Sequence, residues 1–463
     1  MKHICRFLLL LFALSTCSGQ SRPNLVIIYC DDLGYGDIGP FGATKQKTPA
    51  LDQMAKEGMR LTDFYSTCSV CTPSRASLMT GCYPRRVNMH QDEKNLCVLF
   101  PAARKGLHPD EVTIADLLKT QGYRTKCIGK WHLGDHPDFL PTRQGFDSYL
   151  GIPYSNDMNR KEVPLPLVRD EQAIELVIGR KQSPLTERYT KEAVHFIKES
   201  GRQPFFLYFP HAAVHNPLFP GKQFLGKSQN GKYGDWVEEI DWSTEQILQA
   251  IKDAGVDNNT MVVFTSDNGA GNKLGRNAPL KGKKGRTDEG GMRVPCVVRW
   301  PGKIPAGTSS GALTTTMDWL PTMAHLTGTA LPDNPIDGHN IWPVLTAKTS
   351  TSPYDAFYYY QMDQLQAVRS GKWKLFVEME SKKKNWGKPE GAAELLLYDL
   401  DQDIGESRNV AEANPSVVQR LLAFAEEARN ELGDVNCKGS GQRKAGWVDT
   451  PAPRLLPSAS DNN

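Results

Sequence analysis

The chain has 463 residues, which is more than one compact core usually contains and suits two domains. With 39% hydrophobic and 23% charged residues, its composition is that of an ordinary globular protein and argues against a disordered or fibrous chain. The formal net charge is only +3, so charge gives no reason to expect nucleic acid or an anionic membrane as a partner.

The N-terminus has the pattern of an export signal over residues 1–19. Lys2 and Arg6 precede an apolar run over residues 7–14, and small residues follow up to about Gly19. This apolar run is too short to cross a bilayer, and no later segment is long and apolar enough to be transmembrane. A buried N-terminal helix is the alternative interpretation.

Two further features bear on location. Residues 14–17 loosely resemble a bacterial lipoprotein box ending at Cys17, and the chain carries a single N-glycosylation sequon at Asn258-Asn259-Thr260. We therefore expect an exported protein that is periplasmic, attached to the cell surface or secreted, and we favour these locations over a lysosomal one.

Strand-like and helical segments alternate through the first two-thirds of the chain. Strands are predicted over residues 24–30, 205–209, 261–265 and 294–300, and helices over residues 49–59, 111–120, 187–198 and 236–254. This alternation predicts an α/β catalytic domain over residues 20–345, built on a mixed, largely parallel sheet flanked by helices.

The pattern changes after about residue 345. Strands separated by polar turns are predicted over residues 357–360, 366–376 and 395–400, and an amphipathic helix over residues 417–432. We expect a smaller α+β domain over residues 346–432, with an antiparallel sheet and a helix, packed on the first domain. From Gly433 to residue 463 the chain is rich in Gly, Pro, Ser and Asn, which predicts a loosely ordered tail.

Acidic residues follow two of the predicted strands directly. Asp31 and Asp32 follow the first strand, and Asp267 and Asn268 follow the strand over residues 261–265. Open α/β sheets place their sites at these carboxyl ends, so the three carboxylates would repel one another unless a cation lies among them. Oxygen donors suit calcium or magnesium, at about 2.3–2.6 Å, better than zinc. Taken alone, paired aspartates after a strand are more often a helix cap or a turn.

The most specific motif is Cys71-Thr72-Pro73-Ser74-Arg75, which continues to Thr80-Gly81. It resembles the C-x-P-S-R-x-x-x-x-T-G element of type I sulfatases, in which the cysteine is oxidised to formylglycine after translation. The resemblance implies that Cys71 is the precursor of the catalytic group and that a formylglycine-generating enzyme matures the chain. The alternative is a turn leading into an ordinary helix in which Cys71 is merely packed.

Three basic segments extend the resemblance. Residues 129–134, which contain Lys130 and His132, resemble the family's G-K-W-H-L-G element, and residues 281–293 resemble its G-K-x-T-x-x-G-G segment and align Lys284 with the sulfate-binding lysine. His215 lies two residues before a proline, as the family's histidine does. His211 is expected to be structural. Lys281, Lys283 and Arg286 are expected to be charges at the rim of the site.

The resemblance extends from about residue 24 to about residue 410 and is closest to the arylsulfatases. Ser155, at the end of Gly151-Ile-Pro-Tyr-Ser155, matches a serine that binds near the sulfate, but Asn156 stands where a histidine is usual. Ile404 replaces a proline in the motif that ends at Glu406, a position expected to be far from the chemistry. The difference at Asn156 leaves the substrate open and the core reaction intact.

The resemblance implies an alkaline-phosphatase-like fold and a calcium-dependent hydrolysis of sulfate monoesters. One Ca²⁺ would be held by Asp31, Asp32, Asp267, Asn268 and an oxygen of residue 71. A hydroxyl of the hydrated aldehyde, deprotonated with help from Asp267, would attack sulfur, and His215 or Lys284 would protonate the leaving alcohol. His132, oriented with Lys130, would take the proton from the second hydroxyl. Arg75 would hold the formylglycine, and Lys130, Ser155, His215 and Lys284 would bind the sulfate.

Two rival functions remain. A phosphatase or phosphodiesterase of the same broad superfold would use Ser or Thr with zinc, whereas this chain has Cys71 at that position. A non-catalytic binder of sulfated glycans would result if Cys71 were never oxidised. Among substrates, the ends of glycosaminoglycans, algal polysaccharides and small aryl sulfates all stay possible, and no nucleic acid is expected.

Seven cysteines lie outside the leader and the motif. Cys30, Cys127 and Cys296 lie in apolar strand-like runs and are expected to be buried thiols. Cys68, Cys82 and Cys97 could pair among themselves in an oxidising compartment. The odd number leaves at least one thiol free or bonded to another molecule.

Overall fold

A computed structural model describes residues 22–456. The predicted export signal and Cys17 lie outside the described residues, and so does the end of the predicted tail from residue 457. No helix within the described range is long and apolar enough to cross a membrane.

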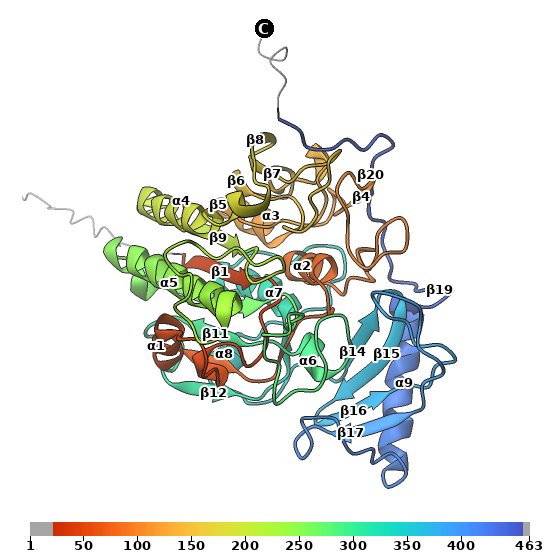
Figure 1. The fold of residues 1–463 in the computed structure, drawn as a ribbon. Coiled ribbons are helices and arrows are strands. Elements are labelled where there is room, and N and C mark those ends of the chain that lie inside the picture. The colour runs from red at the N-terminus through yellow and green to blue at the C-terminus, as the bar shows by residue number, and fades with distance from the viewer. Residues whose placement is uncertain (1–21, 457–463) are drawn as a thin grey trace, which may run out of the picture.

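The large unit is built on one ten-stranded sheet, in the order β12-β2-β11-β10-β1-β9-β5-β6-β7-β8 (Figure 1). Its centre is five parallel strands: β10 (Thr260–Ser266), β1 (Asn24–Cys30), β9 (Phe205–Pro210), β5 (Arg124–Ile128) and β6 (Ser148–Gly151). The outer strands are β11 (Cys296–Arg299), β2 (Met59–Leu61) and β12 (Thr308–Ser310) on one side, and β7 (Pro166–Arg169) and β8 (Gln172–Leu176) on the other. The mixed, largely parallel sheet predicted from the sequence is confirmed.

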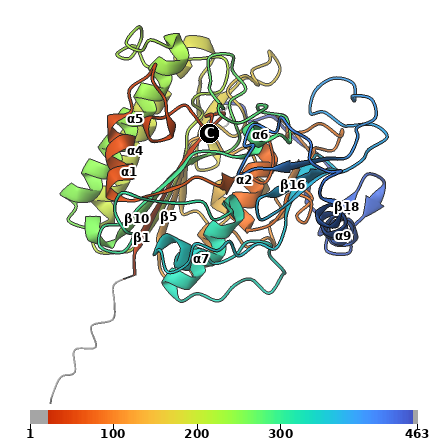
Figure 2. The same cartoon turned by 90° about the horizontal axis from the view of Figure 1, so that it is seen from below.

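Helices cover both faces of this sheet (Figures 1 and 2). Along β1, Val26 and Ile28 enter one apolar cluster while Leu25 and Ile27 enter another, as the alternation of side chains along a strand requires. The first cluster includes side chains of α1 (Pro49–Glu57), α4 (Leu185–Ser200) and α5 (Gly231–Asp253). The second includes side chains of α2 (Cys71–Thr80), α3 (Ile114–Lys119), α7 (Trp319–Thr327) and α8 (Trp342–Leu345).

The C-terminal unit is a four-stranded antiparallel sheet with one long helix beside it, in blue in Figure 1. Its strands are β14 (Phe357–Gln361), β15 (Gln364–Ser370), β16 (Trp373–Phe376) and β17 (Leu396–Asp399), and its helix is α9 (Pro415–Leu432). The segment predicted over residues 366–376 is two strands, because the chain reverses at Gly371, whose φ of +55° suits glycine. The domain boundary at residue 345 stays a prediction.

The tail differs from the sequence-based expectation. Between residues 433 and 456 it forms β18 (Gly433–Asp434), which pairs with β19 (Cys437–Lys438), and β20 (Gly446–Trp447), which pairs with β4 (Lys105–Gly106) of the large unit. Arg443 donates to Glu111 with Nε at 2.7 Å and Nη2 at 2.8 Å. The tail composition did not reveal this order, because the order comes from contacts with distant parts of the chain.

The eight cysteines of the described residues are all free thiols. Cys30, Cys127 and Cys296 lie buried in β1, β5 and β11, as their apolar surroundings predicted. The pairing considered for Cys68, Cys82 and Cys97 is not formed, and all three side chains are buried.

Candidate active site

The predicted site residues converge at the carboxyl ends of the central parallel strands. Each strand of this group ends in a loop that carries polar side chains toward the same edge, which is where open α/β sheets place their sites. β1 leads to Asp31 and Asp32, β10 to Asp267 and Asn268, β5 to Lys130 and His132, β6 to Ser155, and β9 to His215. The remaining members are Cys71 and Arg75 on α2 and Lys284 on the loop before α6 (Glu289–Met292).

An oxygen-rich cluster lies at the centre. One ligand atom each from Asp31, Cys71 and Asp267 can be chosen so that all three lie within 4.8 Å of one another, and all three side chains are buried. Asn268 donates from Nδ2 to Asp32 Oδ1 at 2.8 Å. Asp31 Oδ1 and Asn268 Oδ1 accept no hydrogen bond from the described residues. Leaving buried acceptors unsatisfied costs about 1–3 kcal/mol each, so this donor set fits a hard cation that oxygen ligands would bind.

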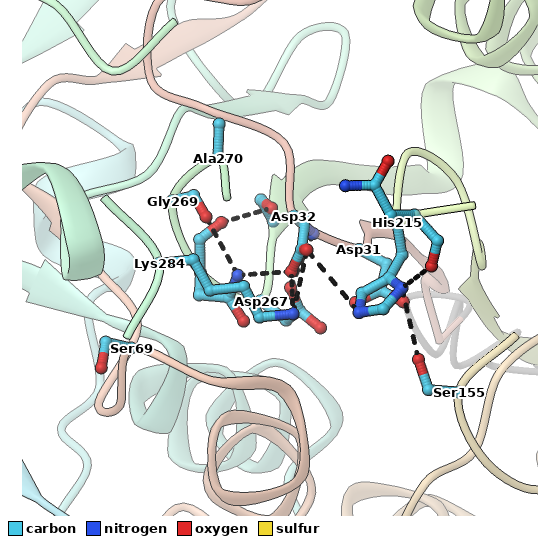
Figure 3. Close-up of polar contacts among 12 residues, drawn as sticks. Asp31, Asp32, Ser69, Ser155, His215, Asp267, Gly269, Ala270 and Lys284 are labelled. Atoms are coloured by element: carbon cyan, nitrogen blue, oxygen red, sulfur yellow. Dashed lines mark hydrogen bonds and ion pairs between the residues drawn. The ribbon is translucent and has the colours of Figure 1, made fainter. Parts of the chain in front are cut away.

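Cationic and polar groups, among them Ser155, His215 and Lys284, surround these carboxylates (Figure 3). Lys130 Nζ lies 2.6 Å from Asp31 Oδ2 and 3.1 Å from Ser155 Oγ. Lys284 Nζ lies 2.7 Å from Asp32 Oδ1. Burial opposes ionisation of Asp31, but Lys130 and the other nearby cations hold the pKa of its carboxyl well below the usual range. The lysines are therefore held in place by the acids they neutralise.

Arg75 contacts the acidic cluster from inside the fold. Its Nη2 and Nε lie 2.7 and 3.1 Å from Asp267 Oδ2, and its Nη1 donates to the Lys130 carbonyl at 2.9 Å. Burial, together with the Asp31 charge, raises the pKa of Asp267, while Arg75 opposes that shift. Arg75 therefore links helix α2 to the loops after β5 and β10, and it acts on Asp267 as well as near Cys71.

His132 has a defined tautomer. Its Nε2 lies 2.9 Å from the Leu99 carbonyl, which can only accept, so Nε2 carries the hydrogen. Nδ1 has no hydrogen-bond partner among the described residues. Burial and the Lys130 charge lower the pKa of His132 well below its usual value. The neutral ring thus presents a free lone pair on Nδ1, which is what a proton acceptor needs.

His215 is oriented by Asn156. His215 Nδ1 lies 3.0 Å from Asn156 Oδ1 and 2.5 Å from the Asn216 carbonyl. Asn156 Nδ2 donates to the Pro217 carbonyl at 3.1 Å. Because the amide nitrogen is already used, Oδ1 is the acceptor and His215 Nδ1 carries the hydrogen. His215 Nε2 then faces Asp32 Oδ2 at 3.8 Å. Asn156 is buried and supports the site, although the sequence suggested only a departure from the family pattern that leaves the substrate open.

With this geometry in place, comparison with known proteins decides the family. Residues 23–329 match the Sulfatase family, and residues 284–430 match the C-terminal region of N-sulphoglucosamine sulphohydrolase. The chain belongs to the sulfatase family. It is a sulfatase, and the expectation raised by the Cys71 motif is confirmed at that level.

Named relatives agree with this assignment. The sulfatase is 38% identical to human arylsulfatase A over 89% of each chain. It is 40% identical to N-acetylgalactosamine-6-sulfatase of Canis lupus familiaris over 80% of this chain and 74% of the relative. A solved structure of Ps i-CgsB in complex with k-i-k-neocarrahexaose is similar with a TM-score of 0.76 and 28% identity, covering 88% of this chain and 92% of that one.

The residues expected to be peripheral in this sulfatase occupy peripheral positions. Arg286 pairs with Asp288 and with Glu390, and Lys281 and Lys283 are exposed. His211 is buried against Phe209, with ring centroids 4.6 Å apart, and burial lowers its pKa to about 3.

Sequence reasoning missed two contacts at the site. Asn156 was treated only as a departure from the arylsulfatase pattern, although its position beside Ser155 was a usable signal. Trp386, which lies against Lys284, was not singled out, since nothing local connects residue 386 with residue 284.

Proposed function

We propose that this sulfatase hydrolyses sulfate monoesters through a formylglycine derived from Cys71, with one Ca²⁺ bound by Asp31, Asp32, Asp267, Asn268 and residue 71. The observation that carries the proposal is the position of Cys71, buried on the first turn of α2 with Asp31 and Asp267 ligand atoms within 4.8 Å. When present, the formylglycine supplies a hydrated aldehyde as nucleophile and the cation favours its ionised form.

The protein's own residues would bind the sulfate. Lys130 and Lys284 are fixed by Asp31 and Asp32, so their ammonium groups need little reorganisation to donate to sulfate oxygens. Ser155 Oγ lies between Lys130 Nζ at 3.1 Å and His215 Nδ1 at 3.5 Å, and it adds a hydroxyl donor on the same side. These donors suit an ester whose oxygens gain negative charge as the bond to the alcohol breaks.

Three proton movements are assigned to side chains of the site. Cleavage of the ester leaves an alkoxide or phenoxide oxygen that must gain a proton. The proposed donors are Lys284 Nζ and His215 in its protonated form, and both groups flank Asp32. Release of sulfate from residue 71 requires removal of a proton, for which the free lone pair of His132 Nδ1 is suited. Asp267, whose pKa burial raises, is the proposed base for the nucleophile.

The substrate would be a sulfated carbohydrate or an aryl sulfate. Two relatives support a carbohydrate, because one is named for N-acetylgalactosamine-6-sulfate and another was solved with a neocarrahexaose. We further propose that the chain is exported to the periplasm, the cell surface or the medium, and that a formylglycine-generating enzyme modifies Cys71 there or on the way. The mass of the mature N-terminus tests the export step.

The decisive experiment combines peptide mass with activity. Protein coexpressed with a formylglycine-generating enzyme should show the aldehyde at residue 71, hydrolyse 4-nitrophenyl sulfate and lose this activity after calcium removal. Cys71→Ala should lose turnover by at least about 10³-fold while its thermal unfolding is unchanged, because it removes the nucleophile alone. Cys30→Ala, at a buried strand position, is the matched control and should retain turnover.

Three results would contradict the proposal. If Cys71→Ala turned over substrate as fast as the unsubstituted protein, residue 71 would not be the source of the nucleophile. Hydrolysis of phosphate esters without sulfatase activity would favour the phosphatase alternative. An unmodified Cys71 in the native host would favour a protein that binds sulfated glycans without cleaving them.

A further inference from the structure

The loop between β16 and β17 brings an exposed tryptophan to the active site. Trp386 has 56% of its surface exposed, which is unusual for so large an apolar side chain. Its ring lies 6.0 Å from Lys284 Nζ, within the range of a cation–π contact. Lys284 is the residue that pairs with Asp32 and is proposed to bind the sulfate. The exposed ring therefore borders the sulfate-binding group directly.

The backbone at Gly285 is shaped to receive this ring. A Cβ atom on Gly285 would lie 2.5 Å from Trp386 Cζ3, so the ring rests on bare backbone that any side chain would block. Gly285 also has a φ of +81°, which favours glycine. Its amide donates to the Ser69 carbonyl at 2.9 Å. The platform under Trp386 is thus tied to the segment that leads into Cys71.

The neighbouring residue anchors the loop. Asn385 is only 8% exposed, and its Nδ2 donates to Ser69 Oγ at 3.4 Å. Its Oδ1 has no hydrogen-bond partner among the described residues. A buried amide oxygen without a partner is costly unless a ligand or water donates to it. The Trp386 ring is therefore exposed, but its neighbour Asn385 holds the loop in place. Asn385 Oδ1 is a buried acceptor without a partner in the part of the chain that the structure describes.

The surroundings of Trp386 are basic. The loop runs Lys382-Lys383-Lys384-Asn385-Trp386-Gly387-Lys388, and Lys283 lies beside Lys284 in the sequence. Lys283 and Lys388 are exposed and have no carboxylate within salt-bridge distance in residues 22–456. Lys384 has only a 3.9 Å contact with Glu390, whereas Lys383 is paired with Asp363 at 2.6 Å. Lys283 and Lys388, which are near Lys284 and Trp386 in the sequence, are thus without a carboxylate partner in the described part of the chain, and Lys384 is only weakly paired.

We propose that Trp386, held in place by Asn385, and the lysines around it bind the sugar residue next to the sulfated one, so that the substrate is a sulfated oligosaccharide or polysaccharide. This deepens the proposed function and rests on it. The apolar face of a pyranose ring packs on an exposed indole. Sulfate or carboxylate groups on that sugar would pair with Lys283, Lys384 or Lys388. A small aryl sulfate would occupy the sulfate position but has no neighbouring sugar to contact Trp386 and these lysines.

The test compares two kinds of substrate. Trp386→Ala should raise KM for a sulfated oligosaccharide, chosen from carrageenan and chondroitin 6-sulfate fragments, about tenfold more than it raises KM for 4-nitrophenyl sulfate. Trp386→Phe keeps an aromatic face and should restore most of the oligosaccharide affinity. Trp447→Ala, at a tryptophan that is 53% exposed elsewhere on the surface, is the control and should leave both KM values unchanged.

Binding is also measured without turnover. Calorimetry with Cys71→Ala protein should show that the preferred oligosaccharide binds more tightly than its sulfated monosaccharide, and that adding Trp386→Ala removes the difference. Equal affinity for the two ligands, or equal losses on both substrates after Trp386→Ala, would overturn this proposal. Because calorimetry needs no nucleophile, loss of the oligosaccharide preference is distinguishable from failure of the sulfatase mechanism.

Discussion

At the residue scale, the chemistry of the site depends on how its two histidines are held. A hydrogen bond at one ring nitrogen decides whether the other nitrogen is available for proton transfer. His132 offers Nδ1 because Nε2 is held by the Leu99 carbonyl. His215 offers Nε2 because Nδ1 is held by Asn156 and by the Asn216 carbonyl. In both cases the hydrogen-bond partners of one ring nitrogen select the tautomer. The motif residues alone therefore do not define the chemistry, since their neighbours decide which nitrogen is available.

The first prediction concerns Asn156 as a positioning residue. Asn156→Ala removes one of the two acceptors of His215 Nδ1–H and leaves only the Asn216 carbonyl, so the ring is held less firmly and kcat/KM should fall by up to about tenfold. Asn156→Asp retains an acceptor at the same position and should recover much of the loss. The measurement is the pH dependence of kcat/KM, whose limb assigned to His215 should move in the Ala variant.

Asn159→Ala is a suitable control, because Asn159 is exposed on the same loop. If Asn156→Ala keeps full activity with an unchanged pH profile, the orienting role of Asn156 is wrong.

At the element scale, the C-terminal sheet supports the loop that carries Lys284. Lys374 on β16 donates to the Thr287 carbonyl at 2.8 Å and pairs with Glu289 at 3.0 Å and Glu406 at 2.7 Å. Glu406 Oε2 in turn accepts from the Glu289 amide at 2.8 Å. The motif that contains Ile404 and Glu406, which the sequence suggested is remote from the chemistry, therefore holds the active-site loop from behind.

The second prediction follows from burial of this network. Lys374→Ala leaves Glu289 and Glu406 close together without their shared cation, and all three side chains are fully buried in the native protein. Breaking a buried ion pair in this way costs about 3–5 kcal/mol, so the free energy of unfolding should fall by that amount in denaturant titrations.

Lys372→Ala provides the comparison, because Lys372 pairs with Asp399 at 2.6 Å but has 41% of its side chain exposed. Its loss should cost less than about 1 kcal/mol. Equal effects of the two substitutions would show that the buried network contributes nothing beyond a surface pair.

At the scale of the whole molecule, burial of acids makes stability depend on pH. Glu239 on α5 is fully buried, and burial raises its pKa to about 8 from an ordinary value of 4.5, although the Gly221 amide donates to Oε2 at 2.7 Å. The folded state therefore prefers the protonated acid. The contribution of Glu239 to stability is fully present below pH 4.5 and is lost as the pH rises through about 8.

The third prediction is that Glu239→Gln flattens this dependence. The amide oxygen can still accept from Gly221, and no charge has to be buried at high pH, so the variant should be more stable than the native protein at pH 8 by on the order of a few kcal/mol. Denaturant titrations at pH 5, 7 and 8, as approximate points across the window, measure the effect. Glu245→Gln on the exposed side of α5 should leave the slope unchanged, whereas an unchanged slope in Glu239→Gln would contradict the assignment.

The sequence by itself determined the sheet centre and most of the site. Two apolar runs, which end in Asp31-Asp32 and Asp267-Asn268, predict strands, because the side chains of a strand covered on both faces are apolar. The carboxyl ends of such parallel strands lie at one edge of the sheet, which brings the acidic residues together. The Cys71 motif and the segments around Lys130 and Lys284 indicated the sulfatase family. Each of these signals is local, since it lies within one stretch of about ten residues.

Only the tertiary structure decided which of these groups touch and what supports them. The pairing of Lys130 with Asp31 and of Lys284 with Asp32, the hold of Asn156 on His215, and the approach of Trp386 to Gly285 all join residues far apart in the chain. The same is true of the short outer strands and of β20, which pairs with β4 although the composition there predicts a loose tail. Such contacts depend on strand order and loop path, and no local pattern of residues encodes either one.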